Sequence, residues 1–212
     1  MTADSEKDIK YLKAIGRVVA LALKKMMKEA RPGMTTAELD NIGSEFLKKE
    51  GATSAPQAMY KFPGATCISI SPVIAHGIPD SHVLQEGELI NIDVSAEIDG
   101  YFADTGASMV LSKHIPEVEK MLKATRSALA KAVHSAKSGQ PLNIIGKTIQ
   151  QEASHNGFNV IYDLTGHGIG RHLHEKPSAV YNFYKPDDRR MLNEGLVLAI
   201  EPFLTTGKGH VV

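Results

Sequence analysis

The spacing of apolar residues changes along the chain from a helical period to alternation. Over residues 5–29, apolar side chains recur every three or four positions, which is typical of an amphipathic helix. A second helix is predicted over residues 35–50, between a threonine cap and Gly51. Alternating runs at 66–80 and 87–111 then predict short strands. The first half is therefore expected to be two helices followed by strands.

The second half is expected to repeat this order. Pro116 opens a predicted helix that continues to about Ala136, and another helix is predicted over residues 142–156. Strands are then expected within three runs, at residues 158–164, 177–182 and 195–202.

A shift of 106 residues aligns parts of the two halves. It places Ala30 on Ala136, Gly33 on Gly139, Leu39 on Ile145 and Gly51 on Gly157. The repeated order favours two similar halves, about 1–110 and 111–212, that share one sheet with helices on one face. Chance matches between helix-ending residues are the alternative. Since no flexible linker separates the halves, a single domain over residues 1–212 is expected.

Composition is that of an ordinary globular protein. The chain has 212 residues, 42% of them apolar, and its 24 basic residues balance 24 acidic ones. Such a balance would not attract nucleic acid or an anionic membrane, and the aliphatic run 18–23 is too short to cross a bilayer. A single cysteine, Cys67, excludes an internal disulfide and fits a reducing compartment. We therefore expect a cytoplasmic protein without membrane or direct nucleic-acid partners, whose metal ligands, if any, are His, Asp and Glu.

The segment NIDVSAEIDGYFADTG, residues 91–106, places two acids in a predicted hairpin. The Asp-Gly pair in its middle tolerates the positive φ of a two-residue turn. Counting outward from that turn pairs Ser95 with Asp104 and puts Asp93 on the same face, diagonal to Asp104. In a half-buried site, two such carboxylates require protonation or a cation between them. A polar face directed at water is the alternative.

Three more side chains are candidates for chemistry. His167 lies between glycines in TGHGIGRHLHEKP, residues 165–177, where glycines mark the close approach of a ligand or another backbone. No helix follows to bind a phosphate, and Ser178 stands where a helical zinc motif needs histidine. Glu201 ends an aliphatic run, so its carboxylate needs a partner, and His76 lies at a Gly-Pro turn. Structural roles are the alternative for each.

Together these acids and one imidazole suit a carboxylate-rich pair of Mn, Co, Fe(II) or Zn sites better than one structural zinc. Four strings carry a specific resemblance to the methionine aminopeptidases, in the order and approximate spacing of that family. They are HGIPD at 76–80, NIDVSAEIDGYFADT at 91–105, GHGIGRHLHEKP at 166–177 and EPF at 201–203. The resemblance covers nearly the whole chain.

The resemblance implies a fold and a metal centre. The fold would be the pita-bread fold, of the α/β (α+β) class, with two pseudo-symmetric halves around a curved antiparallel sheet. The centre would hold two divalent metal ions, with Co, Mn, Fe(II) and Zn as candidates. Asp93 would bind one ion through both oxygens, and Asp104 would bridge the pair. His167 and Glu201 would bind the other ion.

The same matching assigns substrate contacts. His76 and His174 would lie near the scissile amide as catalytic side chains. Ser95 would support the ligands from behind. Phe62 and Cys67 would line an apolar pocket for the methionine side chain.

The implied activity is removal of the N-terminal methionine from nascent proteins with a small second residue. Two cations about 3.5 to 4 Å apart would acidify a bridging water and polarise the scissile carbonyl. The resulting hydroxide would attack, with His174 donating to the oxyanion and Glu201 carrying the proton. The short interval between these residues leaves no room for the helical insertion of type II enzymes, so type I is expected. Expected partners are the nascent N-terminal peptide and, as a candidate, the ribosome, with the protein a monomer.

One departure from the family is serious. Relatives carry a fifth ligand, a glutamate on a strand after the EPF string, whereas no acid follows Glu201 in this sequence. We expect that the C-terminal strands are missing from the sequence, because the other four ligands are kept. The alternative is a naturally impaired relative that acts as a binding protein on the same scaffold. Balanced charge and the retained ligands argue against it.

Without that fifth carboxylate, one side of the metal pair is open. We predict weak or incomplete metal occupancy for the 212-residue chain, measured by elemental analysis after loading with Mn or Co. Two tightly held ions per chain would contradict this prediction.

Overall fold

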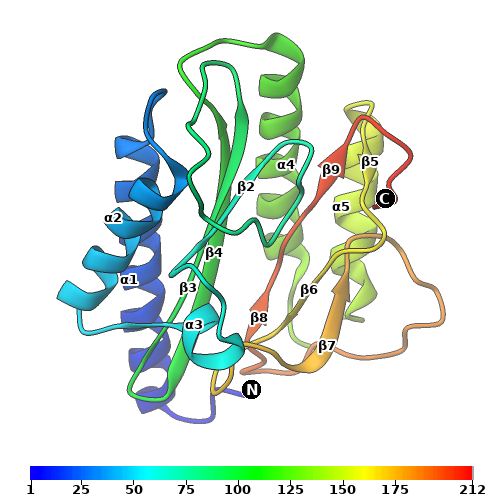
Figure 1. The fold of residues 1–212 in the computed structure, drawn as a ribbon. Coiled ribbons are helices and arrows are strands. Elements are labelled where there is room, and N and C mark those ends of the chain that lie inside the picture. The colour runs from blue at the N-terminus through cyan, green and yellow to red at the C-terminus, as the bar shows by residue number, and fades with distance from the viewer. Residues whose placement is uncertain (212) are drawn as a thin grey trace. The chain divides into compact units, whose positions relative to one another are not determined.

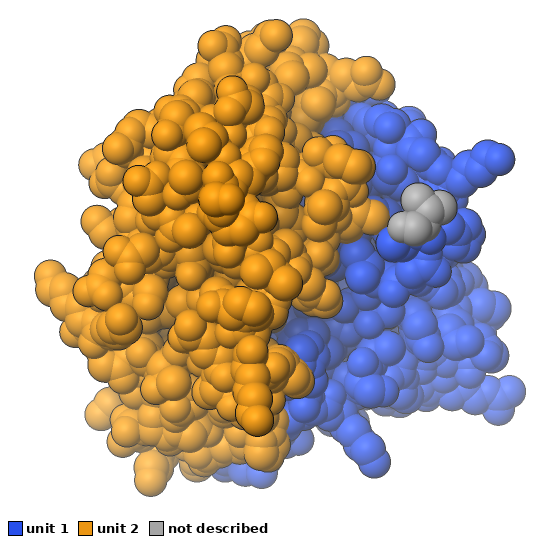
Figure 2. All heavy atoms as spheres, viewed as in Figure 1, with its two compact units in different colours: residues 1–4, 119–170, 174–212 blue, residues 5–118, 171–173 orange. Residues whose placement is uncertain are grey.

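The computed structural model describes residues 1–211. The chain forms two compact units, which Figure 2 colours separately. Unit 1 contains residues 1–4, 119–170 and 174 onward, and unit 2 contains residues 5–118 and 171–173. Among the described residues, no helix combines the length and apolar character that a membrane crossing requires.

The two long helices of unit 2, α1 and α2, form where the apolar period predicts them. α1, Glu6–Glu29, begins after Ser5, whose hydroxyl accepts a hydrogen bond from a backbone amide of the first turn. α2, Thr36–Lys49, begins with a capping box, in which Thr35 and Glu38 each accept a hydrogen bond from the other's backbone amide. Such caps satisfy amides that have no partner within a helix.

The unit 2 sheet is antiparallel and centred on β3, Leu89–Ile98. β3 forms a hairpin with β4, Tyr101–Val110, and also pairs with β2, Cys67–Ile70, and with β1, Thr53–Ser54. α1 packs on β3 and β4 (Figure 1), and its buried side chains include Ile15, Val19 and Met26. Each fully buried aliphatic side chain contributes roughly 1.5 to 3 kcal/mol.

The hairpin turn has the predicted geometry. Asp99 and Gly100 have φ angles of 55° and 77°. Ser95 lies opposite Asp104, as counting outward from the turn predicts. A two-residue turn with both φ values positive matches the twist of the strands that it joins, and so it sets their register.

The alternating run at 66–80 forms a shorter strand than predicted. Only Cys67–Ile70 is a strand, because Pro72 and Pro79 have no amide to donate and His76 adopts a left-handed φ of 56°. The short helix α3, Ala55–Tyr60, was not predicted. Its start is nevertheless marked in the sequence by a capping serine and a proline in the first turn.

Within the part of unit 1 that the structure describes, there are a second helix pair and five strands. α4, Pro116–Ser135, of which Glu119 onward lies in this unit, and α5, Asn143–His155, agree with the predicted helices. β6 pairs with β7 and β8, and β5 pairs with β9. The strands are β5 Asn159–Val160, β6 Thr165–Gly168, β7 Glu175–Tyr181, β8 Leu198–Ala199 and β9 Leu204–Thr205.

Two of the expected strands in this unit are only two residues long. Of the runs 158–164 and 195–202, only Asn159–Val160 and Leu198–Ala199 pair as strands. An apolar run predicts burial, whereas a ladder also requires a partner strand within hydrogen-bonding distance.

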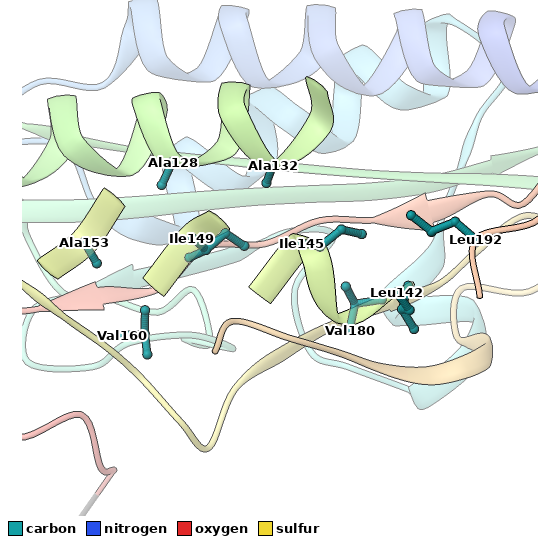
Figure 3. Close-up of a cluster of buried hydrophobic side chains, with 9 residues drawn as sticks. All are labelled: Ala128, Ala132, Leu142, Ile145, Ile149, Ala153, Val160, Val180 and Leu192. Carbon is teal, nitrogen blue, oxygen red and sulfur yellow. The ribbon is translucent and has the colours of Figure 1, made fainter. Parts of the chain in front are cut away.

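The core of unit 1 joins its helices to its strands. Figure 3 shows Ala128 and Ala132 of α4 pointing toward the side of α5 that carries Ile145 and Ile149. Small residues on one helix make room for branched residues on the other. The same cluster contains Leu142, Ala153, Val160, Val180 and Leu192.

One local arrangement occurs in both units. In unit 2 the amide of Gly33 donates to the Leu84 carbonyl at 2.9 Å, and in unit 1 the amide of Gly139 donates to the Leu192 carbonyl at 2.8 Å. The two glycines have φ angles of 87° and 82°. The turn before the second helix is therefore built in the same way twice.

A buried carboxylate ties α4 to α5. Glu152 is 9% exposed, and it accepts hydrogen bonds from Lys131 and from the Ser127 hydroxyl at 2.6 Å. The Lys131 and Ser127 hydrogen bonds hold the pKa of the Glu152 carboxyl below its usual value.

Replacement of Glu152 tests this tie. Because its folded pKa is lowered, its contribution is present above the unfolded pKa of about 4.3 and is lost as the pH falls through the folded value. We expect Glu152→Gln to lower the free energy of unfolding at pH 7 by about 1 to 3 kcal/mol. The free energy of unfolding of this variant should also fall less steeply as the pH is lowered. Urea titrations at pH 7 and between pH 5 and 3 measure both effects. Glu117→Gln, at an exposed position of α4, is the control, and equal losses in the two variants would contradict the prediction.

Candidate active site

The β3–β4 hairpin of unit 2 carries the first pair of predicted ligands. Asp93 lies opposite Gly106, and Asp104 lies opposite Ser95. Both carboxylates are half-buried, whereas Ser95 is 5% exposed. Residues with this diagonal relation have Cα atoms roughly 7 to 8 Å apart on one face of the sheet. The hairpin therefore directs two acids toward the same side.

The pKa of the Cys67 thiol on β2 is affected by the negative charge of this pair. It lies opposite Asp93 and is 7% exposed. Burial, and then the charges of Asp93 and Asp104, raise the pKa of its thiol to about 12. A bound cation would offset this concentration of negative charge.

The chain segment before Cys67 is held by an acid that sequence reasoning missed. Asp40 on α2 accepts hydrogen bonds from the amides of Ala65 and Thr66, at 3.0 and 2.8 Å, and from the Thr66 hydroxyl at 2.6 Å. Asp40 thereby fixes the end of the segment that contains the half-buried Phe62. An aspartate inside a helix was the only available signal, because its partners lie more than 20 residues away in the sequence.

His76 is presented by a turn fastened to β2. Its φ of 56° is unusual for a residue with a side chain. The amide of Gly77 donates to the Ser69 hydroxyl at 3.0 Å, and the Gly77 carbonyl accepts from the amide of Ile68 at 3.0 Å. A side chain at position 77 would collide with the backbone of Ile68, so glycine is required there. The exposed His76 side chain therefore projects from a rigid turn.

In unit 1, His167 and Glu201 form the second pair of predicted ligands. His167 is 5% exposed, and its Nδ1 lies 3.0 Å from the Gly168 carbonyl oxygen. Its Nε2 lies 3.2 Å from Oε1 of Glu201. Among the described residues, that buried oxygen has no hydrogen-bond partner of good geometry.

The positions of the ring nitrogens and the carboxylate oxygen make this pair suitable for a cation. A carbonyl oxygen can only accept, so Nδ1 of His167 must carry the proton. In a neutral imidazole, Nε2 then presents a lone pair to the Glu201 carboxylate. Two acceptors this close require a proton or a metal ion between them. The donor set therefore fits a divalent metal.

The glycines beside His167 have a steric explanation. A side chain at Gly166 would collide with the Ala199 carbonyl, and one at Gly168 with the Lys176 carbonyl. Of the two alternatives in the sequence, a ligand or another backbone, it is another backbone that approaches both glycines. This close packing holds β6 against β7 and β8 and so fixes His167 between them.

His174 lies beside His167, immediately before β7. The two ring centroids are 4.1 Å apart, and the ring planes are inclined at 46°. Leu173, the residue before it, is 4% exposed, whereas His174 is exposed. The structure therefore places a third functional candidate next to the His167–Glu201 pair.

Asp93 and Glu201 occupy corresponding positions in the repeated segments. The string EGELINID at 86–93 matches EGLVLAIE at 194–201 over a shift of 108 residues. These strings follow Leu84 and Leu192, whose carbonyls accept the equivalent hydrogen bonds in the two units. The shift of 106 that aligns the helices misses this match by two residues. A search at neighbouring shifts would have found it.

Comparison with known proteins agrees with these features. Residues 10–212 match Metallopeptidase family M24. The chain is 45% identical over 213 residues to methionine aminopeptidase 2 of Bacillus subtilis (strain 168), covering all of this chain and 86% of that protein.

Solved structures share the fold. A methionine aminopeptidase from Thermotoga maritima has a TM-score of 0.94 and 32% identity, over all of this chain and 86% of that one. The prolidase from Pyrococcus furiosus, at a TM-score of 0.80 and 20% identity, covers 95% of this chain and 58% of its own, and it shows the fold alone. The expected α/β pita-bread fold is confirmed. This chain belongs to Metallopeptidase family M24.

Proposed function

We propose that the chain is a methionine aminopeptidase that removes the N-terminal methionine from proteins with a small second residue. One observation carries the proposal. The Nε2 of His167 and a buried oxygen of Glu201 lie 3.2 Å apart, and the Nδ1 of the same imidazole lies 3.0 Å from a carbonyl oxygen. Relatives of this chain carry the name methionine aminopeptidase, which supports this reaction.

The ligand assignment is part of the proposal. Asp93 and Asp104 of unit 2 and His167 and Glu201 of unit 1 would together hold two divalent ions, with Mn, Co, Fe(II) and Zn as candidates. Carboxylate oxygens and one imidazole suit these ions. Bound divalent ions lower the pKa of water and polarise a carbonyl. Ser95, which is buried opposite Asp104, would support the carboxylates.

The remaining candidate residues would bind and orient the peptide. His174 would donate a hydrogen bond to the oxygen that becomes negative as the amide is attacked. His76 would contact the same amide, and Glu201 would carry the proton to the departing amine. Phe62 and Cys67 would line the methionine pocket, where a protonated, buried thiol behaves as an apolar group.

The biological setting follows from this substrate. We propose that the protein is a type I enzyme that acts in the cytoplasm on nascent N-terminal peptides, as a monomer and with the ribosome as a candidate partner. A metal-poor binding protein on the same fold is the competing function, and the assay below separates the two.

The proposal predicts methionine release from the peptide Met-Ala-Ser in the presence of Mn or Co. We expect Asp104→Asn and His167→Ala to lower kcat/KM by at least about 100-fold, because each removes a ligand. Asp187→Asn removes an exposed acid and should leave the rate unchanged. The absence of methionine release with either metal would reject the proposed function.

The role of His174 predicts a separate kinetic signature. A donor to the developing oxyanion acts mainly in the transition state, so we expect His174→Ala to lower kcat about 100-fold and to change KM less than about threefold. His172→Ala, which alters the exposed histidine two residues earlier, is the matched control. A raised KM with an unchanged kcat would instead assign His174 to substrate binding alone.

A further inference from the structure

The turn before His174 belongs to a different compact unit from the residues on either side of it. Arg171, His172 and Leu173 group with unit 2, whereas Gly170 before them and His174 after them group with unit 1. Leu173 is buried. Contacts within unit 2 therefore hold this three-residue turn.

Arg171 makes most of the described contacts of the turn. Its guanidinium carbon lies 3.6 Å from the centroid of the Tyr101 ring. Its Nη2 donates to the Tyr101 hydroxyl at 2.6 Å and to Oδ1 of Asp8 at 3.1 Å, and its Nη1 donates to the Gly100 carbonyl at 3.5 Å. Stacking combined with several directed hydrogen bonds fixes the plane of the group, which a lysine ammonium cannot do.

The partners of Arg171 are themselves held by further contacts. Tyr101 is 2% exposed, stacks on Tyr11 with 5.0 Å between ring centroids, and donates its hydroxyl proton to Asp8 at 2.7 Å. Burial raises the pKa of the Tyr101 phenol, so the phenol remains a neutral donor. Asp8 also accepts from the Ser5 hydroxyl at 2.7 Å in the first turn of α1. Arg171 is thus attached to the start of α1 and to the hairpin.

Arg171 lies close in sequence to two candidate site residues. Arg171 follows His167 by four residues and precedes His174 by three. Three residues span at most about 10 Å, so fixing Arg171 restricts the positions that His174 can occupy. No contact of Arg171 with peptide is required for this effect.

We propose that Arg171, held by Tyr101 and Asp8, is a positioning residue for His174. The proposal rests on the proposed function for the role of His174. Loss of the attachment would let the turn move, and a displacement of about 1 Å at a catalytic donor can cost up to about 100-fold in rate.

Kinetics of three variants test the proposal. We expect Arg171→Ala to lower kcat on Met-Ala-Ser about tenfold with KM changed less than about twofold. Arg171→Lys should recover only part of the loss, because lysine cannot make the stacked and paired contacts together. Tyr101→Phe keeps the ring and removes the hydroxyl, so an intermediate loss is expected from a variant with an intact core. Arg17→Ala, at an exposed arginine of α1, is the matched control.

A double-mutant cycle separates positioning from a general loss of structure. In a His174→Ala background, Arg171→Ala should lower kcat less than about twofold, because the residue that it positions is already gone. An undiminished tenfold loss in that background would overturn the proposal. An unchanged kcat in both Arg171→Ala and Tyr101→Phe would overturn it as well.

A measurement that does not depend on enzymatic activity tests the positioning role of Arg171 separately from the proposed function. In ¹H–¹⁵N spectra of the metal-free chain, the His174 ring signals are assigned by their loss in His174→Ala. They should shift or broaden in Arg171→Ala and Tyr101→Phe and remain in place in Arg17→Ala. Shifted signals in a chain that releases no methionine would support positioning while rejecting the peptidase function. Unshifted signals in an active enzyme would reject positioning alone.

Discussion

The candidate site depends on hydrogen-bond acceptors that the fold holds close to one another. Nε2 of His167 faces a buried oxygen of Glu201 at 3.2 Å, and its Nδ1 is engaged by a carbonyl. In unit 2, Asp93 and Asp104 share one side of a hairpin. Bringing acceptors together in partly dehydrated surroundings costs free energy, which a proton or a cation between them offsets. The surrounding structure must therefore hold these groups in place, and a divalent ion would then stabilise them.

Several unrelated contacts supply this rigidity. Backbone carbonyls pressed against Gly166 and Gly168 leave β6 little freedom. The turn that carries His76 is fastened to β2 by Gly77, and Asp40 fixes the segment leading to Cys67. Each contact removes motion from a backbone that carries a functional side chain. Precise placement of polar groups before substrate binds is what makes electrostatic catalysis effective.

The two units use one local design. Gly33 and Gly139 close the same turn, and the strings that end in Asp93 and Glu201 follow equivalent leucines. Corresponding segments therefore carry a carboxylate in each unit. Around these equivalent acids the chemistry differs, because unit 2 adds a second aspartate on β4 whereas unit 1 adds His167 on β6.

The sequence by itself determined the longer helices, the hairpin register and the identity of the candidate ligands, but not the short helix α3. Periods of 3.6 and 2 and the Asp99-Gly100 turn are local properties, so Ser95 opposite Asp104 could be counted from the turn. The placement of His174 against His167, the anchoring by Asp40 and the attachment of Arg171 were decided only by the tertiary structure. Arg171 and Asp8 lie 163 residues apart in the sequence. Local periodicity carries no information about such contacts, because they depend on how distant segments pack.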